Sequence, residues 1–143
     1  MIRLFEFRDL DQIMEIWLEG NLQAHAFVGE EYWRENFEPV KSVLPNAEVY
    51  VDEEAGEIRG FIGMDADYIA GLFVRDAYRG RGIGRRLIEA VRGRKRLSLH
   101  VYERNTGAVA FYRALGFKVK QSRTEKATGE NEYLMVSGET PVF

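Results

Sequence analysis

The feature that most constrains the fold is a glycine–arginine loop placed between an apolar segment and an amphipathic helix. Tyr68 to Val74 is continuously apolar, which is typical of a strand covered on both faces. The loop Arg79-Gly80-Arg81-Gly82-Ile83-Gly84 follows, and the next segment has apolar residues on one helical side, namely Ile83, Leu87, Ile88 and Val91. Glycines let backbone N–H groups turn toward one point, and the start of a helix adds its partial positive charge. This arrangement predicts a seat for an anion, typically a phosphate.

Three other interpretations of the loop compete with an anion seat. A plain surface connection does not explain three glycines that alternate with arginine directly before an apolar helix. A nucleotide P-loop is excluded because no Gly-Lys-Ser/Thr ending is present. A Rossmann dinucleotide site stays open, although Arg85 stands where its last glycine should be; Glu103 would then imitate the ribose-binding acid.

The rest of the chain predicts an alternation of strands and helices. Asp9 is the expected cap of a helix over 10–24, with Gln12 closing a capping box, and Asn105 and Gly116 are the expected caps of a later helix. The expected helices cover residues 10–24, 30–41, a segment after the glycine–arginine loop, and a segment after Asn105; the expected strands cover residues 2–7, 48–52, 58–64, 68–74, 97–102, 117–121 and 133–136. The order β-α-α-β-β-β-α-β-α-β-β predicts an α/β fold, with one mixed sheet, helices on both faces, and a single domain over residues 1–143.

Composition excludes several classes of protein. The chain has 143 residues, no cysteine and a net charge of −3, which argues against a disulfide scaffold, a thiolate metal site and a nucleic-acid binder. A local excess of positive charge exists over Arg79, Arg81, Arg85, Arg86, Arg92, Arg94, Lys95 and Arg96. We attribute most of it to the anion loop rather than to a nucleic-acid surface. The start of the chain does not resemble a signal peptide, and the longest apolar run is too short to cross a bilayer. We therefore expect a soluble cytoplasmic protein with no metal and no membrane partner.

Two blocks of sequence resemble the GNAT superfamily of N-acetyltransferases. The segment Arg79-x-x-Gly82-x-Gly84 is similar to the family's Arg/Gln-x-x-Gly-x-Gly/Ala motif. The segment from Asn105 to Phe117 resembles its Asn-x-x-Ala-x-x-Phe-Tyr-x-x-x-Gly-Phe block, and the spacing between the two blocks also fits. The specific match covers residues 68–117, whereas the first half of the chain agrees only in its pattern of elements.

The resemblance implies acetyl-CoA as cosubstrate. Its pyrophosphate would lie in the loop, and its pantetheine arm between the strand before the loop and the strand after it, with backbone contacts from Leu72, Phe73 and Val74. A backbone N–H near Phe73 would polarise the thioester carbonyl. The implied loop contacts are Arg79, Gly80, Arg81, Gly82, Ile83, Gly84 and Arg85. Asn105 either caps its helix only or also contacts the cofactor.

The resemblance also implies roles for two catalytic side chains. Tyr112 matches the tyrosine that protonates the leaving thiolate and is also a cofactor contact; its alternative is one more aromatic residue of the helix stripe. A phenol has a pKa of about 10 against about 8.5 for a thiol, so the site must assist full proton transfer. His100 faces away from Leu99 and Val101 and suits a general base for the acceptor amine; its alternative is a packed strand residue.

The acceptor wall is expected around the break between the first two helices. Its candidates are His25, Phe27, Trp33 and Tyr68, with Tyr32, Phe37, Asp65 and Asp67 as weaker neighbours. The acceptor is a primary amine of a small molecule or of a protein, at a lysine or the N-terminus. Direct attack is favoured because the chain has no cysteine and no Gly-x-Ser-x-Gly elbow. A non-catalytic acetyl-CoA-binding module, and either a monomer or a homodimer, stay open.

Overall fold

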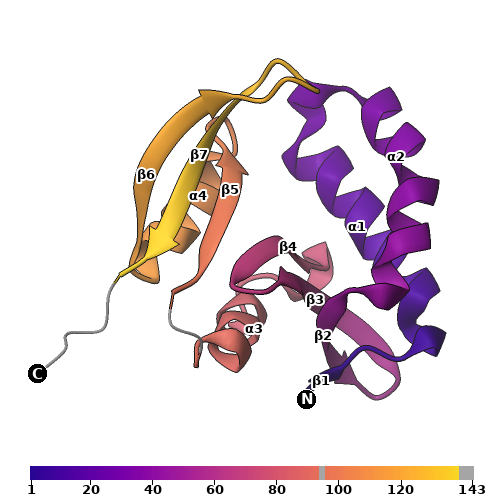
Figure 1. Cartoon of the computed structure of the whole chain (residues 1–143). Coiled ribbons are helices and arrows are strands. Elements are labelled where there is room, and N and C mark those ends of the chain that lie inside the picture. Colours follow the sequence, from indigo (N-terminus) through magenta and orange to yellow (C-terminus); the bar gives the residue numbers. More distant parts are fainter. Residues whose placement is uncertain (94–95, 139–143) are drawn as a thin grey trace, which may run out of the picture.

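The protein folds around one mixed sheet with helices on both faces (Figure 1). The computed structural model describes residues 1–93 and 96–138, so Arg94 and Lys95 of the arginine run lie outside the described residues. The strands are β1 (Ile2–Leu4), β2 (Glu48–Glu54), β3 (Glu57–Asp65), β4 (Tyr68–Val74), β5 (Ser98–Tyr102), β6 (Phe117–Thr124) and β7 (Asn131–Ser137), in the sheet order β1-β2-β3-β4-β5-β7-β6. The helices are α1 (Leu10–Ala24), α2 (Glu30–Val43), α3 (Ile83–Val91) and α4 (Thr106–Ala114), with short 3-10 turns at Phe7–Asp9, Ala26–Val28, Leu44–Asn46 and Asp76–Tyr78. The predicted fold class is confirmed.

The sheet has a weak seam at its centre. β4 and β5 are parallel neighbours, and their pairing in the described chain is limited to Tyr68 with Ser98 and Ile69 with Leu99. The strands on either side of this seam pair antiparallel over much longer stretches. Beyond Ile69 the two strands therefore separate, and the backbone edge of β4 is free of ladder hydrogen bonds to β5.

A β-bulge marks the point where β4 leaves its partner. Gly63 pairs with Gly71 and Met64 with Ile69, so Ala70 is an extra residue with no partner on β3. Such a bulge bends a strand and redirects the side chains that follow it. The bulge thus contributes to the separation of β4 from β5.

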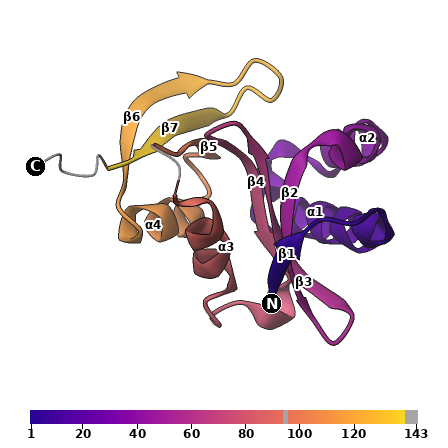
Figure 2. The same cartoon turned by 60° about the horizontal axis from the view of Figure 1, so that its bottom comes forward.

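Two apolar clusters cover the two faces of the sheet, and Figure 2 shows α3 and α4 on one face and α1 on the other. The first joins α3 and α4 to strands from both sides of the seam, and its central members include Ile83, Leu87, Leu99 and Met135. The second joins α1 to β2 and β3 and includes Ile13, Met14, Val51 and Phe61. The seam is therefore closed by packed side chains on the α3 face.

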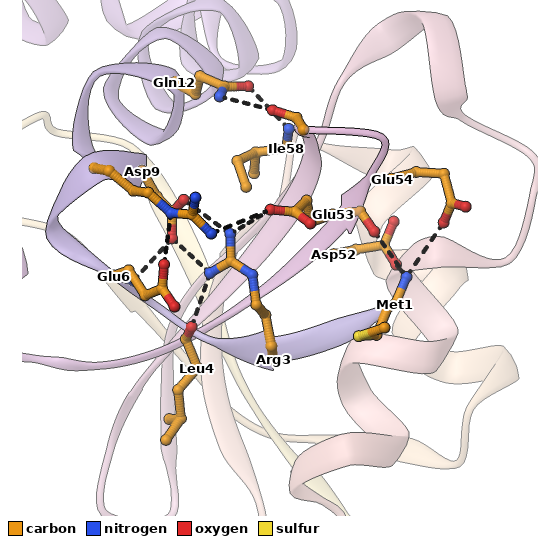
Figure 3. Close-up of polar contacts among 12 residues, drawn as sticks. Met1, Arg3, Leu4, Glu6, Asp9, Gln12, Asp52, Glu53, Glu54 and Ile58 are labelled. Carbon is orange, nitrogen blue, oxygen red and sulfur yellow. Dashed lines mark hydrogen bonds and ion pairs between the residues drawn. The ribbon is translucent and has the colours of Figure 1, made fainter.

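At the N-terminus the structure differs from two predictions, the end of the first strand and the role of Asp9 (Figure 3). The first strand ends at Leu4 and not at residue 7, because residues Phe7–Asp9 form a 3-10 turn. Asp9 is buried and accepts two hydrogen bonds from Arg3, at 2.8 and 3.0 Å, and one from the Glu6 backbone. The guanidinium of Arg3 holds the pKa of Asp9 below its usual value. Asp9 consequently closes a capping box for the turn that precedes α1, rather than capping α1 itself.

Gln12, unlike Asp9, does not close a capping box. Its side chain reaches the β2–β3 turn, where it accepts from the Ile58 backbone at 2.9 Å. By contrast, the Asn105 cap is confirmed, since its Oδ1 accepts from the Ala108 backbone at 3.2 Å, and Gly116 has the expected positive φ of 95°. No described helix is long and apolar enough to cross a membrane.

Candidate active site

A cavity of about 660 Å³ opens where β4 and β5 separate. Its walls come from these two strands, from α1, and from the starts of α3 and α4. Most of the predicted site residues line it: Leu72, Phe73, Val74, Arg79, Gly80, Gly82, Ile83, Gly84, Arg85, Asn105, Tyr112, His100, His25, Trp33 and Tyr68. The fold thus brings together residues from segments that lie far apart in the sequence.

Two of the main predicted residues, Arg81 and Phe27, lie outside the cavity wall, and so do the four weaker candidates Tyr32, Phe37, Asp65 and Asp67. The guanidinium of Arg81 lies 5.4 Å from the ring centre of Tyr78, and Arg81 does not line the cavity. The ring of Phe27 packs behind the wall, against His25 and Tyr102, with Arg104 over its face at 4.7 Å. In this structure Phe27 supports residues of the wall rather than facing the cavity.

The glycine–arginine loop gives the cavity a cationic end. Gly80 and Gly82 both have a φ of +78°, which L side chains rarely adopt, and Gly82 is the N-cap of α3. A Cβ at Gly80 would meet nothing within 4 Å. Arg79 and Arg85 line the same end of the cavity. Free N–H groups at a helix start, flanked by arginines, are suited to hold a diphosphate.

The side chains of β4 point to opposite faces of the sheet. Phe73 stacks on Phe61 at 5.5 Å between ring centres and packs toward α1. A Cβ at Gly20 of α1 would lie only 2.6 Å from the Phe73 ring, so this helix position must be glycine for the ring to fit. Leu72 and Val74 pack on the α3 side instead. What β4 presents along the seam is its backbone edge.

Tyr112 lies on α4, where it lines the cavity and belongs to the apolar cluster under α3 and α4. Its side chain is 8% exposed and packs edge-on against Phe111 and Phe117. Burial raises the pKa of Tyr112 above its usual value, so the phenol stays protonated at neutral pH. It is therefore a hydrogen-bond donor at the cavity wall.

His100 and Tyr68 form a pair across the closed end of the seam. Their side chains meet through a hydrogen bond of 2.8 Å between the Tyr68 hydroxyl and His100 Nδ1. As predicted, His100 faces away from Leu99 and Val101, which are buried in the α3 cluster. This pairing leaves Nε2 as the nitrogen of His100 that can exchange a proton with a bound molecule.

His25 is held in a chain of hydrogen bonds that runs from α4 to α1. Asn105 Nδ2 lies 2.9 Å from His25 Nε2, and His25 Nδ1 lies 2.7 Å from Asn21 Oδ1. Asn21 Nδ2 donates to the Trp17 carbonyl, which fixes its Oδ1 as an acceptor. His25 is thus neutral with its proton on Nδ1. Burial lowers the pKa of His25 to about 4, in agreement with this assignment.

The cavity also has an acidic end that was not predicted from the sequence. Glu125 and Glu132 line it on the side away from the glycine loop, together with Trp17 and Tyr102. Glu125 accepts from the Tyr102 hydroxyl at 2.8 Å, and Glu132 pairs with Arg123 at 2.6 Å. Glu132 could have been singled out from the sequence, because it is spaced two and four residues from the apolar Leu134 and Val136, on the same face of the last strand. A carboxylate in such a register is unusual unless it has a partner or a function.

The comparisons with known proteins agree with this geometry. Residues 45–119 match the family model described as acetyltransferase (GNAT) domain. The chain is 38% identical over 122 residues to the peptidyl-lysine N-acetyltransferase YiaC of Escherichia coli (strain K12), covering 83% of this chain and 84% of that protein. It is 33% identical over 120 residues to the peptidyl-lysine N-acetyltransferase YjaB of the same organism, covering 82% of each.

Solved structures show the same fold. The solution structure of apo YjaB from Escherichia coli superposes with a TM-score of 0.86 at 28% identity, covering 98% of both chains. A structure of YncA from Salmonella typhimurium with acetyl-CoA superposes with a TM-score of 0.70 at 19% identity, covering 99% of this chain and 97% of that one. On the family match, the relatives and the shared fold together, the chain belongs to the GNAT family of acetyltransferases.

Proposed function

We propose that this protein transfers the acetyl group of acetyl-CoA to the side-chain amine of a protein lysine, by direct attack of the amine on the thioester. The observation that carries this proposal is the polarity of the cavity. Arg79, Arg85 and the loop amides line it at the start of α3, whereas Glu132 lies on the opposite face of the sheet, where Glu125 accepts from the Tyr102 hydroxyl. A polyanionic donor and a cationic acceptor would bind such a cavity from opposite ends.

The residues at the cationic end fit the phosphates of acetyl-CoA. The open space in front of Gly80 and the N-terminus of α3 accommodate a diphosphate without a side-chain clash. The free backbone edge of β4 offers N–H and C=O groups to a pantetheine arm, as an added strand would use them. Acetyl-CoA supplies an activated acetyl group and a thiolate leaving group.

Two side chains are placed to move the protons. A lysine ammonium, with a pKa near 10.4, must lose a proton before its nitrogen can attack, and His100 Nε2 is the proposed acceptor, directly or through water. As the new C–N bond forms and the C–S bond breaks, the nitrogen gives up a second proton and the sulfur gains one. Tyr112 is the proposed donor of a proton or hydrogen bond to that sulfur. The products are the amide and the free thiol.

The choice of a protein lysine over other amines is supported by the relatives YiaC and YjaB, which are both named peptidyl-lysine N-acetyltransferases. The aromatic residues Trp33, Tyr68 and Tyr102 on the acceptor side suit the apolar stem of a lysine. The primary amine of a small molecule would lack contacts outside the cavity that a protein could make.

The test is a thiol-release assay with acetyl-CoA and a panel of amines. The panel holds lysine peptides with a blocked N-terminus, peptides with a free N-terminus and no lysine, a polyamine and an aminoglycoside. We expect the blocked lysine peptides to release thiol fastest, with acetyl-lysine detected by mass spectrometry. Acetyl-CoA binding without thiol release from any amine would overturn the catalytic proposal, and preference for the polyamine or aminoglycoside would overturn the lysine assignment.

A further inference from the structure

The acidic end of the cavity contains a carboxylate with little access to solvent. Glu132 is 4% exposed, although it lies on β7, next to the edge strand β6. Burial of a carboxylate costs several kcal/mol unless opposite charge compensates for it. Within residues 1–93 and 96–138 its compensation is a single ion pair, from Arg123 Nε to Glu132 Oε1 at 2.6 Å, and the Arg123 side chain is 59% exposed.

The strand register fixes the direction of the Glu132 side chain. Tyr102 of β5, Glu132 of β7 and Arg123 of β6 lie opposite one another in adjacent strands. Residues opposite one another in a sheet share a face, and so do residues two apart along a strand. Glu132 therefore lies on the face of Tyr102 and His100, which is the cavity face.

The surroundings of Glu132 match an alkylammonium group. Tyr68 and Tyr102, and also Trp33, contribute aromatic surface to the same part of the cavity. Glu132 lies opposite Tyr102, which is two residues from His100 on the same strand and the same face, so the carboxylate lies near the Tyr68–His100 pair. Arg123 engages Oε1, and no described residue forms a hydrogen bond with Oε2.

We propose that Glu132 determines the specificity for a cationic acceptor: it binds the lysine ammonium within the aromatic wall and delivers it to the Tyr68–His100 pair. This inference rests on the proposed lysine acetylation and adds the residue that selects a charged amine. Glu125 contributes a second negative charge, but its side chain is only half-buried, and its Oε1 accepts hydrogen bonds from Tyr102 and Thr128. Glu132 is the fully buried one of the two carboxylates, so a bound cation would offset the larger cost of burial there.

A pair of matched variants tests this role. Glu132→Gln and Arg123→Gln each remove the same ion pair, but only Glu132→Gln removes the negative charge from the cavity. We expect Glu132→Gln to raise the KM for a lysine peptide about tenfold or more, with a smaller change in kcat and an unchanged Kd for acetyl-CoA. Arg123→Gln should leave this KM unchanged or lower it. Circular dichroism and calorimetric acetyl-CoA binding report whether each variant is folded.

An uncharged acceptor peptide distinguishes a role of Glu132 in charge recognition from a purely structural role, because a structural role would not change the preference between a charged and an uncharged acceptor. A peptide with an aminooxy group in place of the lysine amine is largely uncharged at neutral pH. The wild type should prefer the lysine peptide for binding, and Glu132→Gln should lose that preference. If the wild type acetylates no lysine peptide, the proposed function itself fails. If the wild type is active, an unchanged preference in Glu132→Gln, or an equal rise in KM for Arg123→Gln, would overturn the role of Glu132.

Discussion

Asn105 Nδ2 and His25 Nε2 lie 2.9 Å apart, and this contact joins the start of α4 to the turn after α1. The contact requires an unprotonated Nε2, because the Asn105 Oδ1 is already used to cap α4. A protonated His25 would place two N–H donors against each other. Protonation of His25 at low pH therefore breaks the hydrogen bond that joins the turn after α1 to the start of α4.

The first prediction concerns the stability of the protein at low pH. The pKa of His25 is lowered to about 4 in the folded protein, from 6.5. The unfolded chain therefore binds a proton first as the pH falls, so this contribution to stability is complete above pH 6.5 and is lost as the pH falls toward 4. The loss is on the order of 2–3 kcal/mol.

The variant His25→Phe removes the titration but keeps an aromatic ring beside Phe27, Trp33 and Tyr102. Urea unfolding of both proteins from pH 7 to pH 4 measures the effect. The wild type should lose more unfolding free energy than the variant over this range. If the unfolding free energy of both proteins fell by the same amount between pH 7 and pH 4, His25 would not have the lowered pKa that the structure gives it.

The second prediction concerns the glycine loop. Gly82→Asp should abolish acetyl-CoA binding in calorimetry, because a carboxylate would repel the phosphates and lies within reach of the Arg86 guanidinium, 3.3 Å from the added Cβ. Gly56→Asp is the matched control. It introduces the same residue at a similar φ of +84° in the β2–β3 turn, away from the cavity. Normal affinity in Gly82→Asp, or equal loss in Gly56→Asp, would contradict the loop assignment.

The third prediction concerns Tyr112. Tyr112→Phe should lower kcat by roughly 10²-fold or more if the phenol assists the departing sulfur, and it should leave acetyl-CoA affinity within about twofold. Tyr133→Phe removes a hydroxyl from the same apolar cluster outside the cavity wall. This control should keep normal kcat. If Tyr112→Phe kept the full kcat, the Tyr112 hydroxyl would have no part in the reaction and the side chain would serve only in packing.

The fourth prediction concerns the contact between α1 and β4. Gly20→Ala should destabilise the protein, because the new methyl group would lie 2.6 Å from the Phe73 ring; overpacking of this kind costs about 1–3 kcal/mol. It should also weaken acetyl-CoA binding, since Phe73 belongs to the strand that lines the seam. Phe73→Leu in the same chain should restore part of the stability in chemical unfolding. If the changes in unfolding free energy caused by Gly20→Ala and Phe73→Leu simply added in the double variant, a direct contact between these two positions would be contradicted.

The fold and the conformation of the loop before α3 could be predicted from the sequence because those features depend on local pattern. Glycines before an apolar helix and the Asn105 cap are encoded by residues that are neighbours in the chain, and the element order followed from periodicity. Asp9 occupies the expected N-cap position of α1, but the expected capping box with Gln12 was wrong for a tertiary reason. Asp9 and Gln12 are engaged by Arg3 and by the β2–β3 turn, which the chain pattern does not place nearby.

The acceptor end was the least predictable part. Phe27 was expected to face the acceptor and packs behind the wall instead, whereas Glu125 and Glu132 were not singled out. These carboxylates reach the cavity because β7 inserts between β5 and β6, and β7 is not adjacent to β5 in the sequence. Long-range strand order of this kind decides which polar residues face a cavity.

The most direct test of the account is an NMR titration of the labelled protein with acetyl-CoA. The account predicts saturable changes in the backbone amide signals of Gly80, Gly82 and Gly84 and of Leu72 to Val74, with the Gly56 signal unchanged. That result would place the diphosphate in the loop and the pantetheine arm along β4. Saturable changes confined to other regions, or none at all, would contradict the central claim that the seam between β4 and β5 is the acetyl-CoA site.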